Sequence, residues 1–349
     1  MKLTLPDIAD KCNNPLQIGS VINGACSLIF VLSLTLFASF LQNRVFAAGD
    51  DTNAETPLYG MIVTGKRPGP PLWKVTNEDK VLWIFGTLQI LPKKLRWDPV
   101  SVRYILSESS QYISPPQVSA IELNPFKAYS LLRRMNKMQQ NPDGKTLQDV
   151  LPTELYARFL EAKEIYAPRD KKILNLRPLE ASGRLLSAAR ESVGLHYDSK
   201  VSKKLRSIAR GRGATLIDHK RSLEVDAVFQ AFDNLQLRDE IACLETRLET
   251  IRTDLEAAVI RTNAWANGRA ELLLELDYPD PDAKCMSILA NSNAIGNTME
   301  QVRIDWIESI QHALSNNSVS LANFPMREIV HPEGLLAQLR QQGYVVSRN

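Results

Sequence analysis

Histidine and cysteine are scarce in this sequence of 349 residues, which contains 4 of each. So few ligands leave little material for a multi-histidine or cysteine-rich metal site. Neither sign of charge is in clear excess, because 42 Lys and Arg face 39 Asp and Glu, for a formal net charge of +3. Dedicated nucleic-acid-binding proteins usually carry a marked excess of basic residues. We therefore expect no nucleic-acid partner.

The common catalytic motifs are also missing. The chain contains no Walker A loop, GxGxxG, HExxH, GxSxG or CxxC, which are the short patterns that would point to a specific chemistry. Hydrophobic residues make up 44% and charged residues 23% of the chain, as in ordinary globular proteins. This composition excludes a disordered chain, a collagen-like repeat and a polytopic membrane protein.

Residues 1–47 have the layout of a secretory signal peptide. A weakly basic start precedes an apolar run from Ala25 to Leu41, and Val45 and Ala47 supply the small residues that signal peptidase recognises. The length of the run leaves an uncleaved signal anchor as the alternative. We expect a periplasmic or secreted protein that is not an integral membrane protein after cleavage, because no second run of spanning length follows.

Two cysteines remain after such a cleavage, Cys243 and Cys285. In an oxidising compartment they are candidates for a disulfide. The alternative is a pair of buried free thiols, since one widely spaced pair has no framework signature.

Strand and helix patterns alternate in the first part of the mature chain. Residues 48–60 are polar and are expected to form a flexible lead-in. Apolar runs predict strands at 72–75, 81–88 and 117–123. A helix is expected from Asp98 and Pro99 to about residue 110, because these two residues are typical of a helix start.

Most of the remaining chain has helical periodicity. Helices are expected at about 126–138, 153–166, 178–193, 198–211, 222–267 with possible breaks, and 283–314. A strand at 319–324, a helix at 333–342 and a strand at 344–346 close the sequence. The predicted fold class is α/β (α+β-like): a central mixed sheet built from N- and C-terminal strands. We expect a single domain over 61–349, with a large helical insertion over about 126–314.

Two features of the helical part admit more than one interpretation. Apolar residues recur at spacings of four and three along 237–255, as in a coiled-coil seam or in an amphipathic arm packed on its own domain. The segment 200–221 is rich in Lys and Arg. It could bind an anionic polymer or a lipid head group, or it could be the solvated face of a helix.

The two ends of the chain resemble the TraB/GumN family. The resemblance rests on Leu72-Trp73-Lys74-Val75, on the segment Leu82–Gln89, on Ile121-Glu122-Leu123, and on Gly334–Leu339 with Gly343-Tyr344-Val345. The middle of the chain is similar to the longer GumN-like branch in bacteria. This resemblance implies an α/β fold with a central sheet and a helical insertion.

Members resembling the Tiki metalloproteases use two Gly-x-x-His motifs and a Glu to hold a divalent metal for peptide hydrolysis. Here Gly86 matches the first glycine, but Gln89 stands at the position of the histidine. Glu328 occupies the second histidine position, with His331 nearby, and Glu122 matches the family glutamate. A glutamine amide is a much poorer metal ligand than imidazole, so we expect degenerate metal motifs.

Our first hypothesis is an exported, catalytically degenerate protein that acts as a binding or accessory module of the cell envelope, with no cofactor. Its partner would be an envelope protein, a peptide or an anionic polymer. Its ligand cleft would contain Gly86, Gln89, Glu122, Glu328 and His331. The alternative is a divergent metal-dependent hydrolase or protease with an oxygen-rich site suited to Mn²⁺. That site would use Glu122 as a catalytic residue with Glu328 and either His331 or Asp218. A third possibility is an oligomerising structural protein built on the 237–255 seam.

Overall fold

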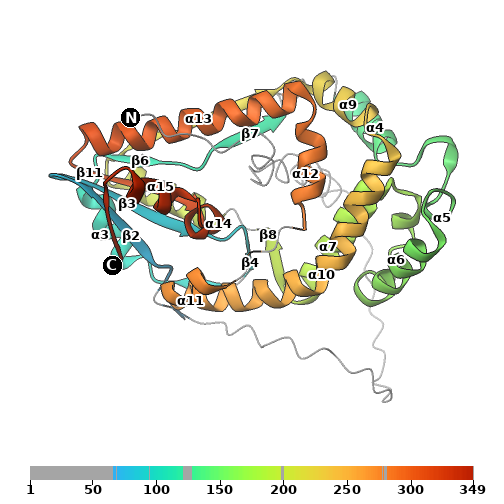
Figure 1. The fold of residues 1–349 in the computed structure, drawn as a ribbon, viewed down its shortest axis with the longest axis horizontal. Coiled ribbons are helices and arrows are strands. Elements are labelled where there is room, and N and C mark those ends of the chain that lie inside the picture. Colours follow the sequence, from blue (N-terminus) through green and yellow to red (C-terminus); the bar gives the residue numbers. More distant parts are fainter. Residues whose placement is uncertain are drawn as a thin grey trace, which may run out of the picture.

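The computed structural model describes residues 66–67, 69–93, 95–120, 128–197, 200–276, 278 and 281–348. The largest sheet of the described residues has six strands and is mixed; its strands lie at the left of the molecule in Figure 1. Its strands, in spatial order, are β12 (Val345–Arg348), β2 (Leu72–Asn77), β3 (Lys80–Thr87), β11 (Val319–Pro325), β6 (Gln111–Ile113) and β9 (Thr215–Ile217). Strand β2 is antiparallel to both of its neighbours, whereas β3, β11, β6 and β9 run parallel. The predicted α/β class, with a sheet closed by the C-terminal strand, is confirmed.

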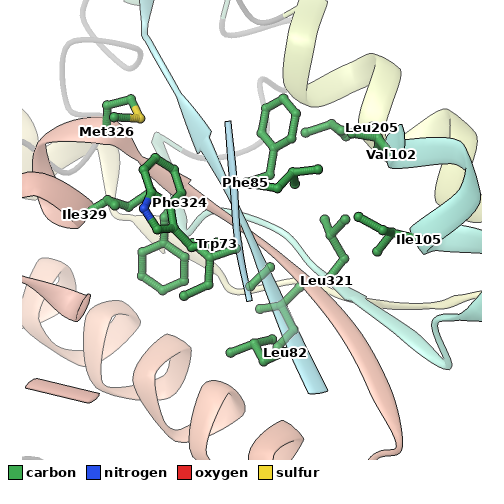
Figure 2. Packing of buried hydrophobic residues seen from close by; sticks show 14 of the residues in the cluster. Trp73, Leu82, Phe85, Val102, Ile105, Leu205, Leu321, Phe324, Met326 and Ile329 are labelled. Carbon is green, nitrogen blue, oxygen red and sulfur yellow. The ribbon is translucent and has the colours of Figure 1, made fainter. Parts of the chain in front are cut away.

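The two middle strands of the sheet are β3 and β11. Both are apolar along most of their length, as is typical of strands that helices cover on both faces. Figure 2 shows Val102 and Ile105 on one side of the sheet, with Met326 and Ile329 on the other. The first pair belongs to α3 (Val100–Glu108), which lies beside α8 (Lys200–Gly211). The second pair belongs to α14 (Met326–Val330). The sheet is thus the middle layer of three.

Two more helices complete the layer that contains α14. Helix α13 (Asn293–Asn316) crosses this face of the sheet, and Trp306 stacks on Phe324 with ring centroids 3.8 Å apart. Helix α15 (Leu335–Gln341) follows α14 and leads into β12. Because Leu335, Leu336 and Leu339 are buried, this short C-terminal helix fixes the last strand to the sheet.

A group of helices extends away from the sheet (Figure 1). It comprises α4 (Ala128–Met138), α5 (Leu147–Val150), α6 (Thr153–Tyr166), α7 (Pro178–Ser192), α9 (Val225–Asp233), α10 (Leu237–Ala266) and α12 (Ala283–Ala290). Helix α11 (Ala270–Glu275) follows α10 and packs against the sheet, because Ala270 and Leu273 belong to the same hydrophobic cluster as Trp73. Short 3-10 turns occur at Pro142–Gly144 and Lys172–Asn175. Among the described helices, none combines the length and the apolar character needed to cross a bilayer.

The apolar seam of 237–255 is buried within the chain. Leu244, Ile251 and Leu255 of α10 join a hydrophobic cluster with Phe159 of α6 and Leu185 of α7. The structure therefore supports the interpretation of an amphipathic arm packed on its own domain. The predicted disulfide is also confirmed, since Cys243 of α10 is bonded to Cys285 of α12.

Several short strands differ from the sequence-based expectation. The strand predicted at 117–123 is β7 (Gln117–Ala120), which pairs with β10 (Lys220–Leu223) outside the central sheet. Conversely, β9 comes from the middle of the chain and forms an edge of that sheet. Three- and four-residue strands are too short to show a period in the sequence. Tertiary pairing alone decides their place.

Two further strand pairs lie beside the central sheet. Strand β4 (Ile90–Pro92) pairs with β8 (Leu195–Tyr197), and β1 (Lys66–Arg67) pairs with β5 (Arg96–Trp97). The helices expected at 222–267 and 283–314 are each divided in two, because short turns separate α9 from α10 and α12 from α13. The expected signal peptide 1–47, the lead-in 48–60 and Glu122 lie outside the described residues.

Candidate functional site

Four of the five residues of the predicted cleft lie at or just after the carboxyl ends of β3 and β11. The two strands are parallel neighbours, with Gly86 opposite Phe324 in the register. Gln89 follows the end of β3, and Glu328 lies in α14 directly after β11. Ligands of open α/β sheets bind at the carboxyl ends of such strands. This edge is therefore the candidate site.

Gly86 lies in a closely packed environment at this edge. A Cβ atom at this position would overlap the Sδ atom of Met326 and lie 3.2 Å from Ile329. Its carbonyl oxygen accepts a 2.7 Å hydrogen bond from Nε1 of Trp265 in α10. The absence of a side chain at Gly86 thus makes room for the apolar side chains of α14.

Gln89 is partly exposed, and a hydrogen bond from Tyr197 of strand β8 orients its side chain. Its Oε1 atom accepts a 3.1 Å hydrogen bond from the hydroxyl of Tyr197. The β4–β8 pair brings these residues together, since Ile90 is opposite Tyr197 in the register. Tyr197 is 44% exposed, so this polar pair is accessible from solvent.

Glu328 is largely buried beside cationic groups. Its side chain is 15% exposed, and its Oε2 atom lies 3.9 Å from a terminal guanidinium nitrogen of Arg303 in α13. Burial raises the pKa of the Glu328 carboxyl, and the charges of Arg303, Arg327 and His331 partly oppose this shift. The carboxylate is therefore embedded in a basic environment.

His331 ends α14 and uses one ring nitrogen locally. Its Nδ1 atom accepts a 3.1 Å hydrogen bond from the backbone N–H of Glu333. Its carbonyl oxygen accepts a second bond, of 2.8 Å, from the N–H of Gly334. Both contacts order the turn between α14 and α15.

The described donors at these positions do not fit a divalent metal centre. Gln89 offers a neutral amide oxygen that already accepts a hydrogen bond, and the carboxylate of Glu328 faces an arginine. Asp218, at the end of β9, forms a two-point ion pair with Arg206. Across the part of the chain that the structure describes, no three His, Cys, Asp or Glu side chains are grouped as a metal site.

A buried ionic cluster next to Tyr197 is not among the features predicted from the sequence. Asp254 of α10 accepts a 3.0 Å hydrogen bond from Arg190 of α7, and Asp282 accepts one of 2.7 Å from Arg247. Arg261 lies 3.5 Å from Asp254. A sign of this cluster was present in the sequence, because Arg247, Asp254 and Arg261 recur every seven residues and so share one face of α10.

The cluster shifts the pKa values of its members. Burial opposes ionisation of Asp282, but Arg247 and Arg190 hold the pKa of its carboxyl below the ordinary value. The pKa of Arg190 is raised despite its burial, by Asp254, Asp282 and the neighbouring Tyr197. The ionised pairs thus link α7, α10 and the start of α12 to one another, close to Tyr197.

Comparison with protein families agrees with this architecture. The model of the TraB/PrgY/gumN family matches residues 71–348. Comparisons with curated proteins and with solved structures give no match. Because the matched segment covers most of the sequence and contains both ends of the central sheet, the chain belongs to the TraB/PrgY/gumN family.

Proposed function

We propose that this member of the TraB/PrgY/gumN family is an exported envelope protein that binds its ligand without a metal ion and has no hydrolytic centre. The observation that carries the proposal is Gln89, which stands at the position of the first motif histidine and has its amide oxygen bound by the hydroxyl of Tyr197. Export is inferred from the composition of residues 1–47.

The charges at the site favour the same proposal. A divalent cation next to Glu328 would also meet the positive charges of Arg303 and Arg327, which influence this carboxyl group. Repulsion between like charges in a largely buried site opposes the binding of a cation. The carboxylate of Glu328 therefore serves better as a hydrogen-bond acceptor or as a counter-ion of these arginines.

The exposed polar groups suit a ligand with a polar backbone. The Gln89 side chain can donate through Nε2 while its Oε1 accepts from Tyr197, and the Tyr197 oxygen can itself accept a further bond. Donors and acceptors in this arrangement recognise amide or hydroxyl groups. We propose that the ligand is a peptide, a segment of an envelope protein or an anionic polymer.

Metal retention tests the first half of the proposal. The chain from residue 48 is incubated with Mn²⁺, Co²⁺ and Zn²⁺, freed of unbound ion, and measured by elemental analysis. We expect no stoichiometric ion in protein that still melts cooperatively. One ion per chain that is lost in a Glu122→Ala variant would overturn the proposal. That result would favour a divergent hydrolase with an oxygen-rich site.

Ligand binding tests the second half. A panel of peptides and of acidic polysaccharides is screened by thermal shift and by cleavage assays, each with and without chelator. A ligand that raises the melting temperature should lose this effect in Gln89→Ala and Tyr197→Phe, but not in the control Gln301→Ala. Gln301 is an exposed glutamine that bonds to Asp305 on α13. Cleavage that chelator abolishes would contradict a binding role.

A further inference from the structure

Helices α3 and α8 present a common outer surface on one side of the sheet. Each helix buries one side, with Val102 and Ile105 of α3 and Leu205 of α8 packed inward (Figure 2). The opposite sides face solvent. We define the α3–α8 surface by the exposed residues Val100, Tyr104, Lys203, Lys204 and Arg210.

The part of this surface from α8 is strongly basic. Residues 200–211 contain five Lys and Arg and no Asp or Glu. Arg206 is partly buried and ion-paired with Asp218, whereas Lys203 and Arg210 are exposed and lie seven residues apart on the same outer face. The outer face of this helix therefore carries the two exposed basic residues Lys203 and Arg210, and the helix itself contains no acidic residue.

The part from α3 adds exposed apolar groups. Tyr104 and Val100 are 65% and 62% exposed and lie four residues apart on one face. Two acidic residues adjoin the α3–α8 surface. Glu108 interacts with the hydroxyl of Tyr104, and the charge of Asp98 acts on Lys204. Even with these, the combined surface is basic and carries an aromatic residue, as in segments that lie in the interfacial layer of membranes.

The upstream chain joins the fold beside this surface. Strand β1 begins at Lys66 and pairs with β5, and Lys204 lies over the ring of Trp97 in β5, 4.8 Å from its centroid. The residues that precede Lys66 include the apolar run 25–41.

We propose that the α3–α8 surface docks on the anionic lipid surface of a membrane. Lys203 and Arg210 would face the lipid phosphates, and Tyr104 would enter the head-group region. Each basic residue within about a Debye length of an anionic bilayer adds its own share to the attraction between protein and lipid. Tyrosine prefers the membrane–water boundary. This inference does not depend on the proposed ligand site.

Vesicle sedimentation tests the proposal. The chain from residue 48 is used because the run 25–41 would itself partition into lipid, and because every described element lies within 66–348. We expect binding to phosphatidylglycerol-containing vesicles, but not to pure phosphatidylcholine, with a loss at high salt. The double variant Lys203→Gln, Arg210→Gln should partition onto these vesicles about thirtyfold more weakly, because each lost positive charge removes its share of the attraction to the anionic lipid. Lys171→Gln with Lys172→Gln, at an exposed turn between α6 and α7, is the matched control.

Each result distinguishes the possible roles of the surface. Equal weakening by the two double variants would mean that only net charge matters and would overturn the proposal. Binding to a soluble acidic polysaccharide but not to vesicles would overturn it in favour of a polymer partner. A further loss in Tyr104→Ser, with unchanged melting temperature, would support insertion of the aromatic ring.

Discussion

Nε1 of Trp265 donates a 2.7 Å hydrogen bond to the carbonyl oxygen of Gly86, which joins the long helix α10 to the central strand β3 across 179 positions of sequence. The Trp265 ring also meets Phe85 and Trp97 edge-on, with centroids 6.3 Å away from each. This contact attaches the helical insertion to the sheet at the edge where the candidate site lies.

Trp265→Phe should destabilise the protein by about 1–3 kcal/mol, because it leaves a buried carbonyl without its donor. Urea unfolding measures the change. Trp306→Phe is the matched control, since Trp306 is equally buried but its Nε1 atom has no partner. If both variants cost the same, ring volume and not the hydrogen bond would explain the loss.

The Cys243–Cys285 disulfide should contribute about 3–4 kcal/mol to the free energy of unfolding, because it closes a loop of 42 residues in the unfolded chain. Reduction with dithiothreitol should lower the urea midpoint accordingly. The Cys243→Ser, Cys285→Ser variant should show the lower midpoint in both conditions. A midpoint that reductant does not change, with both thiols alkylated, would contradict this role.

Arg177→Met should cost about 3–5 kcal/mol at neutral pH, because it leaves Glu240 charged and buried. In the native protein Arg177 Nε donates to Glu240 Oε1 at 2.9 Å, and the Glu240 side chain is 3% exposed. The double variant Arg177→Met, Glu240→Gln should recover part of the loss. A double variant as unstable as the single one would argue that Arg177 acts through its bond to the Phe232 carbonyl.

The same pair predicts a pH dependence. Burial raises the pKa of Glu240 from its ordinary 4.5, and Arg177 opposes the shift. Without Arg177 the folded-state pKa rises further above the unfolded value. Folding then favours the protonated acid, so Arg177→Met should lose stability as pH increases from about 4.5 through the raised pKa. Melting temperatures from pH 4 to 8 measure this, with the double variant as a control that should show no such loss.

Gly86→Ala should destabilise the protein by about 1–3 kcal/mol, as overpacking does, since its Cβ would overlap Met326. Adding Met326→Ala should make the glycine substitution less costly than it is alone, which a double-mutant cycle measures. An unchanged cost in the Met326→Ala background would point instead to the neighbouring Trp73 ring.

Long elements were predictable because their patterns are local. The predicted ends of several long elements agree with the structure to within one or two residues. Examples are the strands Leu72–Asn77 and Lys80–Thr87 and the helix Thr153–Tyr166. The three-residue strands of the central sheet were not predictable. Gln111–Ile113 and Thr215–Ile217 belong to the sheet only because strand β11 and its neighbours provide pairing partners.

The candidate site was partly predictable. Gln89 and Glu328 were identified from the resemblance of the flanking segments to the TraB/GumN family, and the parallel pairing of β3 with β11 places both residues beyond neighbouring strand ends. Tyr197 and Arg190 were not identified, because their relation to Gln89 depends on the β4–β8 pairing and on the packing of α7 against α10. No pattern in the surrounding residues indicates either.

The sequence by itself determined the α/β fold class and the apolar seam along 237–255, because apolar periodicity is a local property. It left open whether the seam packs within the chain and whether Cys243 bonds to Cys285, and the tertiary structure decided both. Tertiary structure alone decided that β7 leaves the central sheet, that Met326 fills the space above Gly86, and that Arg and Asp side chains from three segments form one buried cluster. Such contacts join residues far apart in the chain. Their energies depend on packing and desolvation, which local sequence does not encode.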